Sequence, residues 1–123
     1  MRLGSALFNG QPVLVALAGE DWLNLSVVTE RFHDVSEVLA APDGLDIVAE
    51  LLSSERGILV NESDLIWRPL TPRPGKVICL GLNYADHAAE SPYDRPDYPV
   101  LFARFTTSLI GHCRPLVRPA LSD

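Results

Sequence analysis

A run of eight residues, Arg68–Gly75 (RPLTPRPG), divides this sequence more sharply than any other feature. Its three prolines lack a backbone N–H donor, and proline also disfavours the helical conformation in the residue before it. A segment of this composition is unsuited to a helix interior or a central strand, and is typical of a boundary between folding units. The sequence therefore predicts two parts, residues 1–70 and residues 71–123.

The first part begins with the pattern of a small antiparallel sheet. Asn9-Gly10 is a strong hairpin signal, because both residue types accept the positive φ angles of a type I′ turn. Short apolar runs separated by turn residues predict strands on either side of this turn and further along. Five extended stretches are expected: Arg2–Phe8, Pro12–Ala18, Trp22–Val28, Ile58–Val60 and Leu65–Trp67.

Two helices are expected between the third and fourth of these stretches. Asp34, with a glutamate three residues later, resembles a capping box, so the first helix should begin there and run to about Ala40. The second should begin at Asp43 or Gly44, and Gly57 is expected to end it. Its apolar stripe is expected at helical spacing, on Leu45, Val48, Ala49 and Leu52.

The second part opens with the sequence KVICLGLNYADHAAE, residues 76–90. The apolar and β-branched run in Lys76–Leu80 predicts a buried strand, and Gly81 permits a sharp turn after it. Asn83 is suited to cap a short helix that starts at about Tyr84. A proline-rich loop, a strand and a further short strand are then expected at Glu90–Pro99, Val100–Phe105 and Leu116–Arg118.

His87 and Glu90 are three residues apart, so on the expected helix they share one face. A carboxylate beside an imidazole favours the imidazolium and fixes the tautomer of the ring, which suits proton transfer near neutral pH. The same spacing occurs in exposed helical pairs that contribute only a few tenths of a kcal/mol. Spacing alone therefore leaves a catalytic pair and a solvated surface pair open.

Composition limits the classes of partner. The chain has 123 residues and a net charge of −6, and Lys76 is its single lysine, so no nucleic-acid partner is expected. No apolar stretch approaches 18 residues and no signal peptide follows Met1, so we expect no membrane partner and a cytoplasmic protein. Cys79 and Cys113 make no disulfide framework, and Cys79 is expected to be a buried core residue.

The spaced elements of the second part, taken together, resemble the fumarylacetoacetate hydrolase family. They are Lys76–Glu90, Tyr98–Phe102, Thr106–Gly111 and Leu116–Pro119, within a similarity that covers about Arg73 to Asp123. The resemblance implies an α+β protein in which a small antiparallel β/α N-terminal cap domain (1–70) precedes the first strands and lid helix of an incomplete, mostly-β catalytic domain (71–123). It also implies hydrolysis, decarboxylation or isomerisation of β-diketo or 2-oxo acids, in the catabolism of aromatic or carboxylic acids.

The resemblance assigns roles to individual residues. His87 would be the general base that activates water, and Glu90 the carboxylate that orients it. Tyr84 and Arg104 would bind substrate. Many relatives have lysine at the position of Arg104, so the planar guanidinium group of arginine replaces the point charge of a lysine there. The alternative is that Arg104 is a solvated surface arginine without a role in binding.

A divalent cation, Mg²⁺ or Mn²⁺, is also implied, acting as a Lewis acid on the substrate. The family holds it with a Glu-x-Glu motif and a further aspartate, but this chain contains no Glu-x-Glu. We therefore expect the ligands to lie past Asp123 in a longer parent, no metal to bind this chain, and the chain alone to be inactive. Strands without sheet partners have unpaired backbone N–H and C=O groups along their edges, which can pair with another chain. A homodimer is therefore expected.

Two other classes of function stay open at this stage. Cys79, His87, His112 and Cys113 are zinc-type ligands, although their spacing matches no common zinc finger. Residues 1–70 carry no constellation of acids with a histidine or nucleophile, and His33 stands isolated among them. A non-catalytic interaction or assembly domain derived from the family is therefore the alternative to an enzyme.

Overall fold

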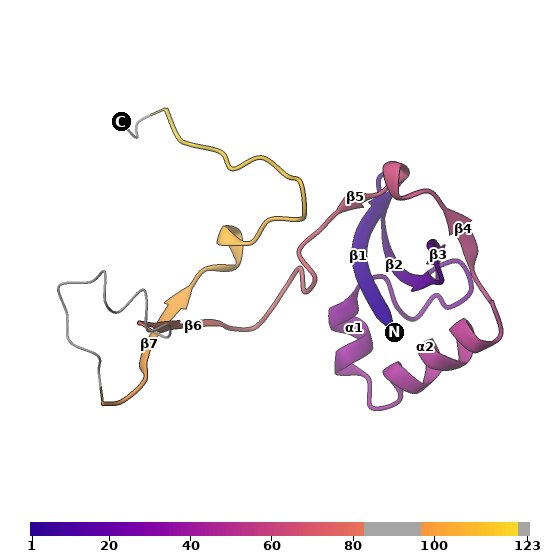
Figure 1. Cartoon of the computed structure of the whole chain (residues 1–123), viewed down its shortest axis with the longest axis horizontal. Coiled ribbons are helices and arrows are strands. Elements are labelled where there is room, and N and C mark those ends of the chain that lie inside the picture. Colours follow the sequence, from indigo (N-terminus) through magenta and orange to yellow (C-terminus); the bar gives the residue numbers. More distant parts are fainter. Residues whose placement is uncertain (83–96, 121–123) are drawn as a thin grey trace. The chain divides into compact units, whose positions relative to one another are not determined.

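The structure is a computed structural model that describes residues 1–82 and 97–120 (Figure 1). The chain divides into two compact units. The first comprises Met1–Arg73 together with Leu109–Asp123, and the second comprises Pro74–Ser108. Helices and antiparallel sheets are both present, which confirms the expected mixture of α and β structure.

The first unit is built on a five-stranded sheet in the order β4-β3-β2-β1-β5, in which every neighbouring pair is antiparallel. The hairpin between β1 and β2 turns at Asn9 and Gly10, whose φ angles of 51° and 77° confirm the expected turn. The strands are β1 (Arg2–Phe8), β2 (Gln11–Ala18), β3 (Asp21–Asn24), β4 (Ile58–Val60) and β5 (Ile66–Trp67).

The third strand is shorter than predicted, because it ends at Asn24 and not at Val28. Ser26 intercepts the hydrogen bonds that would continue the ladder. Its Oγ accepts from the N–H of Leu14 (2.8 Å) and donates to the carbonyl of Phe32 (2.7 Å), while its N–H donates to Asn24 Oδ1 (3.0 Å). Such side-chain bonds to the backbone compete with strand pairing and turn the chain toward the helices.

Two helices, α1 (Val35–Ala40) and α2 (Gly44–Ser53), form where the sequence predicts them. The expected cap of α1 is confirmed, since Asp34 Oδ1 accepts from the N–H of Glu37 at 3.1 Å. A two-point ion pair joins Arg31 to Asp43 at 2.9 and 2.7 Å. This hydrogen bonding raises the pKa of Arg31 and lowers the pKa of Asp43.

The end of α2 and its buried face differ from the prediction. The helix stops at Ser53, because Glu55 takes the left-handed conformation (φ 51°) and its N–H bonds to the carbonyl of Leu52 at 3.1 Å. Arg56 N–H bonds to Leu51 O at 2.9 Å, which completes a Schellman motif before Gly57 is reached.

The expected stripe on α2 is wrong at two of its positions, because Leu45 and Ala49 are exposed. Gly44, Val48 and Leu51 are buried instead. A Cβ on Gly44 would lie 2.1 Å from the carbonyl oxygen of Val38, so only glycine permits this approach to α1. The close crossing sets the rotation of α2, and periodicity in the sequence does not reveal it.

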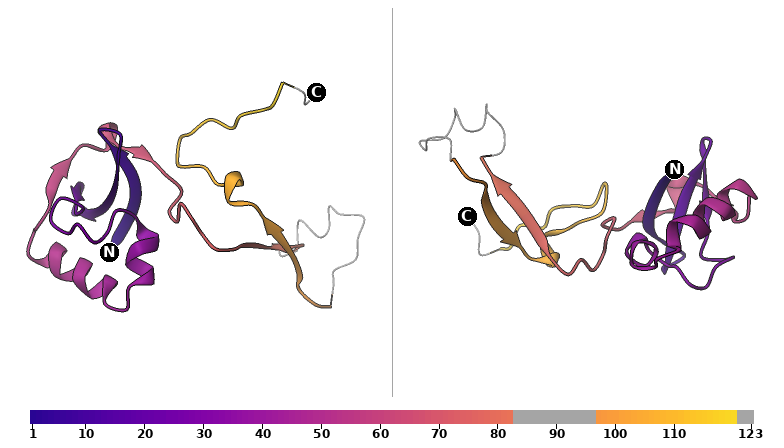
Figure 2. Two further views of the ribbon diagram at one scale, coloured as in Figure 1. Left: turned by 180° about the vertical axis from the view of Figure 1, so that it is seen from behind. Right: turned by 90° about the horizontal axis from the view of Figure 1, so that it is seen from below.

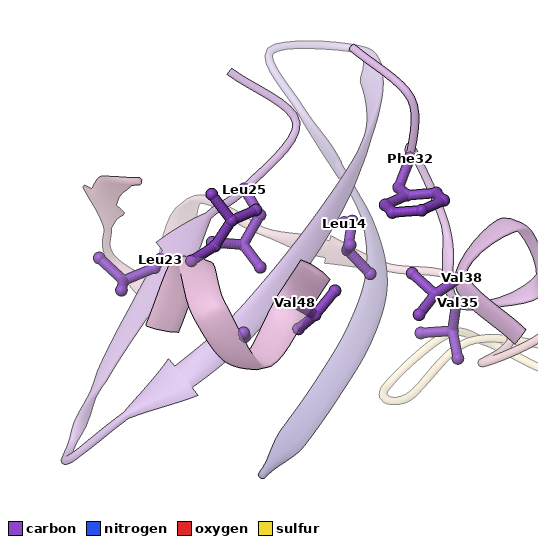
Figure 3. Close-up of a cluster of buried hydrophobic side chains, with 9 residues drawn as sticks. Leu14, Leu23, Leu25, Phe32, Val35, Val38 and Val48 are labelled. Carbon is purple, nitrogen blue, oxygen red and sulfur yellow. The ribbon is translucent and has the colours of Figure 1, made fainter. Parts of the chain in front are cut away.

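Both faces of the five-stranded sheet bear apolar residues, and both are covered. On one face the residues labelled in Figure 3 pack together: Leu14, Leu23, Leu25, Phe32, Val35, Val38 and Val48. On the other face Val13 and Val15 join a smaller cluster, against which Trp22 and Trp67 pack with their rings edge to face at 4.9 Å. Strand β2 serves both clusters because successive side chains point to opposite faces.

The second unit contains a two-stranded antiparallel ribbon of β6 (Val77–Gly81) and β7 (Val100–Arg104), seen side by side in Figure 2. Both strands were predicted, but β6 is not buried as expected and Cys79 is only half-buried. The reason is that, among the described residues, each strand has only one neighbour.

Other expectations for the second part are overturned or lie outside the described residues. Residues 114–119 have no regular secondary structure, so the strand predicted at Leu116–Arg118 is wrong, and Leu116 and Val117 are exposed. The helix expected from Tyr84, and the loop expected after Glu90 as far as residue 96, lie outside the described residues. In the part of the chain that is described, no helix has the length and apolarity that crossing a membrane requires.

Candidate active site

The predicted catalytic residues His87 and Glu90 lie outside the described residues, as do Asn83 and the predicted substrate-binding Tyr84. The structure does describe the two strands, β6 and β7, that flank this segment in the sequence. Gly81, the last residue of β6, pairs with Val100, the first residue of β7. The predicted segment therefore connects two paired strand ends.

The expected turn after β6 begins with an unusual backbone conformation. Gly81 itself stays within the strand, and the next residue, Leu82, has a φ of 52°. Leucine rarely adopts this left-handed conformation, which costs roughly 1–2 kcal/mol relative to its ordinary backbone angles. Backbone conformations of this kind gather at functional sites, and this one marks the point where the candidate segment starts.

Arg104 is the one predicted site residue that the structure describes. It is the last residue of β7, is exposed, and pairs with Val77 at the start of β6. At about 3.3 Å per residue, four steps of strand separate it from Val100 by roughly 13 Å. The structure therefore brings Arg104 together with Val77 and not with the paired strand ends Gly81 and Val100.

The described residues do not supply a metal cage. Among them no three or more His, Cys, Asp or Glu side chains gather closely enough to hold an ion. This covers Cys79, His112 and Cys113 of the set considered for zinc, whereas His87 lies outside the described residues. Hard cations such as Mg²⁺ need clustered oxygen ligands, so no chemical step at a metal follows from this part of the chain.

A polar cluster at the N-terminus of α1 was missed by sequence reasoning, which took His33 to be isolated. Glu37 Oε2 accepts from the backbone N–H of His33 at 2.6 Å and lies 3.5 Å from His33 Nδ1. Asp34, only 1% exposed, accepts from Arg73 Nη2 at 3.3 Å. Arg73 also lies 3.6 Å from Glu37. The cluster fixes the end of the proline-rich segment, because Arg73 is 39 residues from Asp34 in sequence.

Ser5 makes a second attachment of the proline-rich segment to the first unit. Its Oγ donates to the carbonyl of Leu70 at 2.7 Å and accepts from the N–H of Val35 at 3.0 Å. A single hydroxyl thus joins β1, the start of α1 and the segment that leads to the second unit. In the sequence, both attachments are visible only as isolated polar residues. Their hydrogen-bond partners are distant in sequence, and residue spacing does not identify such partners.

Two of the hollows in the first unit are lined by described residues. The larger, of about 700 Å³, lies beside the turn between β2 and β3, and its lining combines leucines with Asp21 and Glu55. Its lining contains no histidine, cysteine or basic residue, so it offers little for acid–base or nucleophilic chemistry. The smaller, of about 360 Å³, lies beside β5 and includes two arginines, Arg68 and Arg114.

Comparison with known proteins identifies the segment that carries the ribbon. Residues 76–123 match the family model described as "Fumarylacetoacetate (FAA) hydrolase C-terminal". The mitochondrial oxaloacetate tautomerase FAHD2A of Bos taurus is 32% identical over 79 residues, which cover 64% of this chain and 25% of that protein. The uncharacterized protein MJ1656 of Methanocaldococcus jannaschii is 42% identical over 50 residues, 41% of this chain and 21% of that protein.

A solved structure gives the same answer for the fold. The crystal structure of a putative HpcE protein from Mycobacterium smegmatis matches with a TM-score of 0.69 and 25% identity, over 98% of this chain and 41% of that chain. The matched family model and the named relatives are those of hydrolases and isomerases. Residues 76–123 are therefore similar to the fumarylacetoacetate hydrolase family, which confirms the resemblance of their motifs.

The chain spans only about a quarter of the length of the curated relatives it matches. The FAHD2A relative is named as a mitochondrial protein, whereas the cytoplasm was expected here, and that location stays a prediction.

Proposed function

We propose that the whole protein to which these residues belong is an enzyme acting on a 2-oxo or β-diketo acid. The observation that carries the proposal is the family match across residues 76–123, a span that includes His87 and Glu90. It is supported by a relative named as an oxaloacetate tautomerase. Protons on a carbon beside a ketone are acidic, so a base with a pKa near 7 can move them, or can instead activate water.

In this proposal His87 transfers the proton, and Glu90 is a positioning residue that orients the imidazole and stabilises its charged form. Tyr84 binds substrate, and Arg104 offers a two-point contact to a substrate carboxylate. The whole enzyme requires a divalent cation, Mg²⁺ or Mn²⁺, as members of this family generally do, with ligands outside the described residues. Because this chain contains no Glu-x-Glu motif, we place those ligands past Asp123 and expect the 123 residues alone to be inactive.

The test measures ketonisation of enol-oxaloacetate and hydrolysis of an acylpyruvate by the full-length protein with Mg²⁺. His87→Ala should lower kcat by about 10²- to 10⁴-fold, the usual contribution of a general base. Glu90→Gln should lower it less and shift the pH profile, because the imidazole loses its charged neighbour. His112→Ala is the matched control, and its turnover should stay near that of the wild type.

Equal turnover in His87→Ala and His112→Ala would remove His87 from the mechanism. The substrate that is turned over separates tautomerisation from hydrolysis. The alternative is a non-catalytic interaction or assembly domain, which the exposed apolar ribbon of β6 and β7 favours. Failure of the full-length protein to turn over either substrate with Mg²⁺ or Mn²⁺ would support that alternative.

A further inference from the structure

The smaller hollow of the first unit, called here the Arg68 cleft, lies where residues 109–117 pack beside the edge strand β5. Most of its lining is apolar, with Leu7, Ile66, Trp67 and Ile110 among the contributors. Its volume of about 360 Å³ falls within the range of small-molecule sites in proteins. The cleft is formed entirely by residues of one unit.

The backbone around the Arg68 cleft is held by close packing. A Cβ on Gly111 would lie 1.8 Å from the carbonyl oxygen of Trp67, so only glycine allows the returning chain to approach β5 this closely. The ring of Trp67 is held in turn, since a Cβ on Gly4 would lie 2.5 Å from its Cζ3 atom. Trp22 contacts the same ring edge to face. The β5 backbone beside the cleft is therefore closely packed, with the ring of Trp67 on the face of the sheet opposite to Leu7 and Ile66.

The backbone N–H groups of both basic residues of the cleft are hydrogen-bonded. The N–H of Arg68 donates to the carbonyl of Ser5 at 2.9 Å, which continues the pairing of β5 with β1. The N–H of Arg114 donates to the carbonyl of Gly111 at 3.2 Å, which closes the turn. Two guanidinium side chains are thus attached to fixed points on opposite sides of the seam between β5 and the returning chain.

The charge of the lining runs against that of the whole chain. The chain carries a net charge of −6, yet Arg68 and Arg114 are the ionisable residues of this lining, and no carboxylate contributes to it. Within residues 1–82 and 97–120, a carboxylate lies within 4.0 Å of Arg31 and of Arg73, but none of Arg68 or Arg114. The cleft therefore presents positive charge beside an apolar wall.

We propose that the Arg68 cleft binds a small organic carboxylate with an apolar body. A guanidinium group matches a carboxylate in planar, two-point geometry, and the aliphatic lining residues Leu7, Ile66 and Ile110 would cover an aryl or branched-alkyl group. Arginine pairs also bind phosphate, but an apolar wall contributes nothing to a fully polar anion. The proposal rests on the described residues of the first unit and not on the proposed enzymatic activity.

Titration of the 123-residue chain with phenylacetate, followed by tryptophan fluorescence, tests the proposal, with phenylacetamide as the uncharged probe of the same shape. Phenylacetate should bind at least tenfold more tightly than the amide, since a hydrogen-bonded ion pair is lost. Arg68→Gln and Arg114→Gln should each weaken its binding roughly tenfold. Arg56→Gln, in the turn after α2, is the matched control and should bind like the wild type.

Equal affinities for the acid and the amide would overturn the proposal, as would unchanged binding in both cleft variants. Tighter binding of inorganic phosphate than of phenylacetate would overturn the assignment of an apolar carboxylate. Weakened binding in Arg104→Gln but not in Arg68→Gln would place the probe at the proposed substrate site, and would overturn the cleft as its site. Circular dichroism of each variant verifies that the fold is retained.

Discussion

At the scale of single residues, Asp34 stabilises more than the short helix that it caps. Its two oxygens bond to different parts of the chain, the start of α1 and the end of the proline-rich segment. We expect Asp34→Ala to lower the free energy of unfolding by about 1–3 kcal/mol, because a helix cap and a bond to Arg73 are lost together. Urea denaturation of the 123-residue chain measures this change.

Asn at the same position separates the two contributions of Asp34. Asparagine is a good helix cap but carries no charge, so Asp34→Asn should keep the cap and weaken only the contact with Arg73. We therefore expect Asp34→Asn to be less destabilising than Asp34→Ala. An Asp34→Ala protein as stable as the wild type would show that neither bond matters to stability.

At the scale of elements, the end of α2 depends on Glu55 holding a conformation that favours glycine. Replacing it with glycine should stabilise the chain by about 1 kcal/mol, because the left-handed conformation costs a β-carbon-bearing residue that much or more. Glu50→Gly, on the exposed face within the same helix, should instead destabilise by about 1 kcal/mol. Thermal unfolding of both variants measures whether each substitution raises or lowers the stability. A destabilising effect of Glu55→Gly would contradict the Schellman motif.

Elements specified by neighbouring residues were predictable, whereas those set by distant contacts were not. The Asn9-Gly10 turn and the Asp34 cap depend on bonds within three residues, and both were confirmed. The end of β3 depends on Ser26 meeting Leu14. His87 and Glu90 could be proposed from a motif, but the place of Arg104 at the far end of the ribbon follows only from strand register.

At the scale of the whole molecule, the β6–β7 ribbon exposes apolar side chains on both of its faces. Directly opposed residues of an antiparallel pair share a face, so Leu80 and Leu101 lie together on one face and Cys79 with Phe102 on the other. Leu101 is 63% exposed and Phe102 is 44% exposed. Contiguous exposed apolar surface of this kind is typical of interaction sites, and β6 and β7 each have one unpaired edge among the described residues.

We therefore predict that the 123-residue chain self-associates through this ribbon at concentrations of tens of micromolar. Sedimentation velocity should show a species of about twice the chain mass of 13.5 kDa. Leu80→Lys combined with Leu101→Lys places two charges on one face and should return the chain to a monomer, since burying them is costly. Leu116→Lys is the control, because Leu116 is exposed but lies outside the ribbon. A monomeric wild-type chain, or a double variant that still associates, would show that these strands do not form the interface.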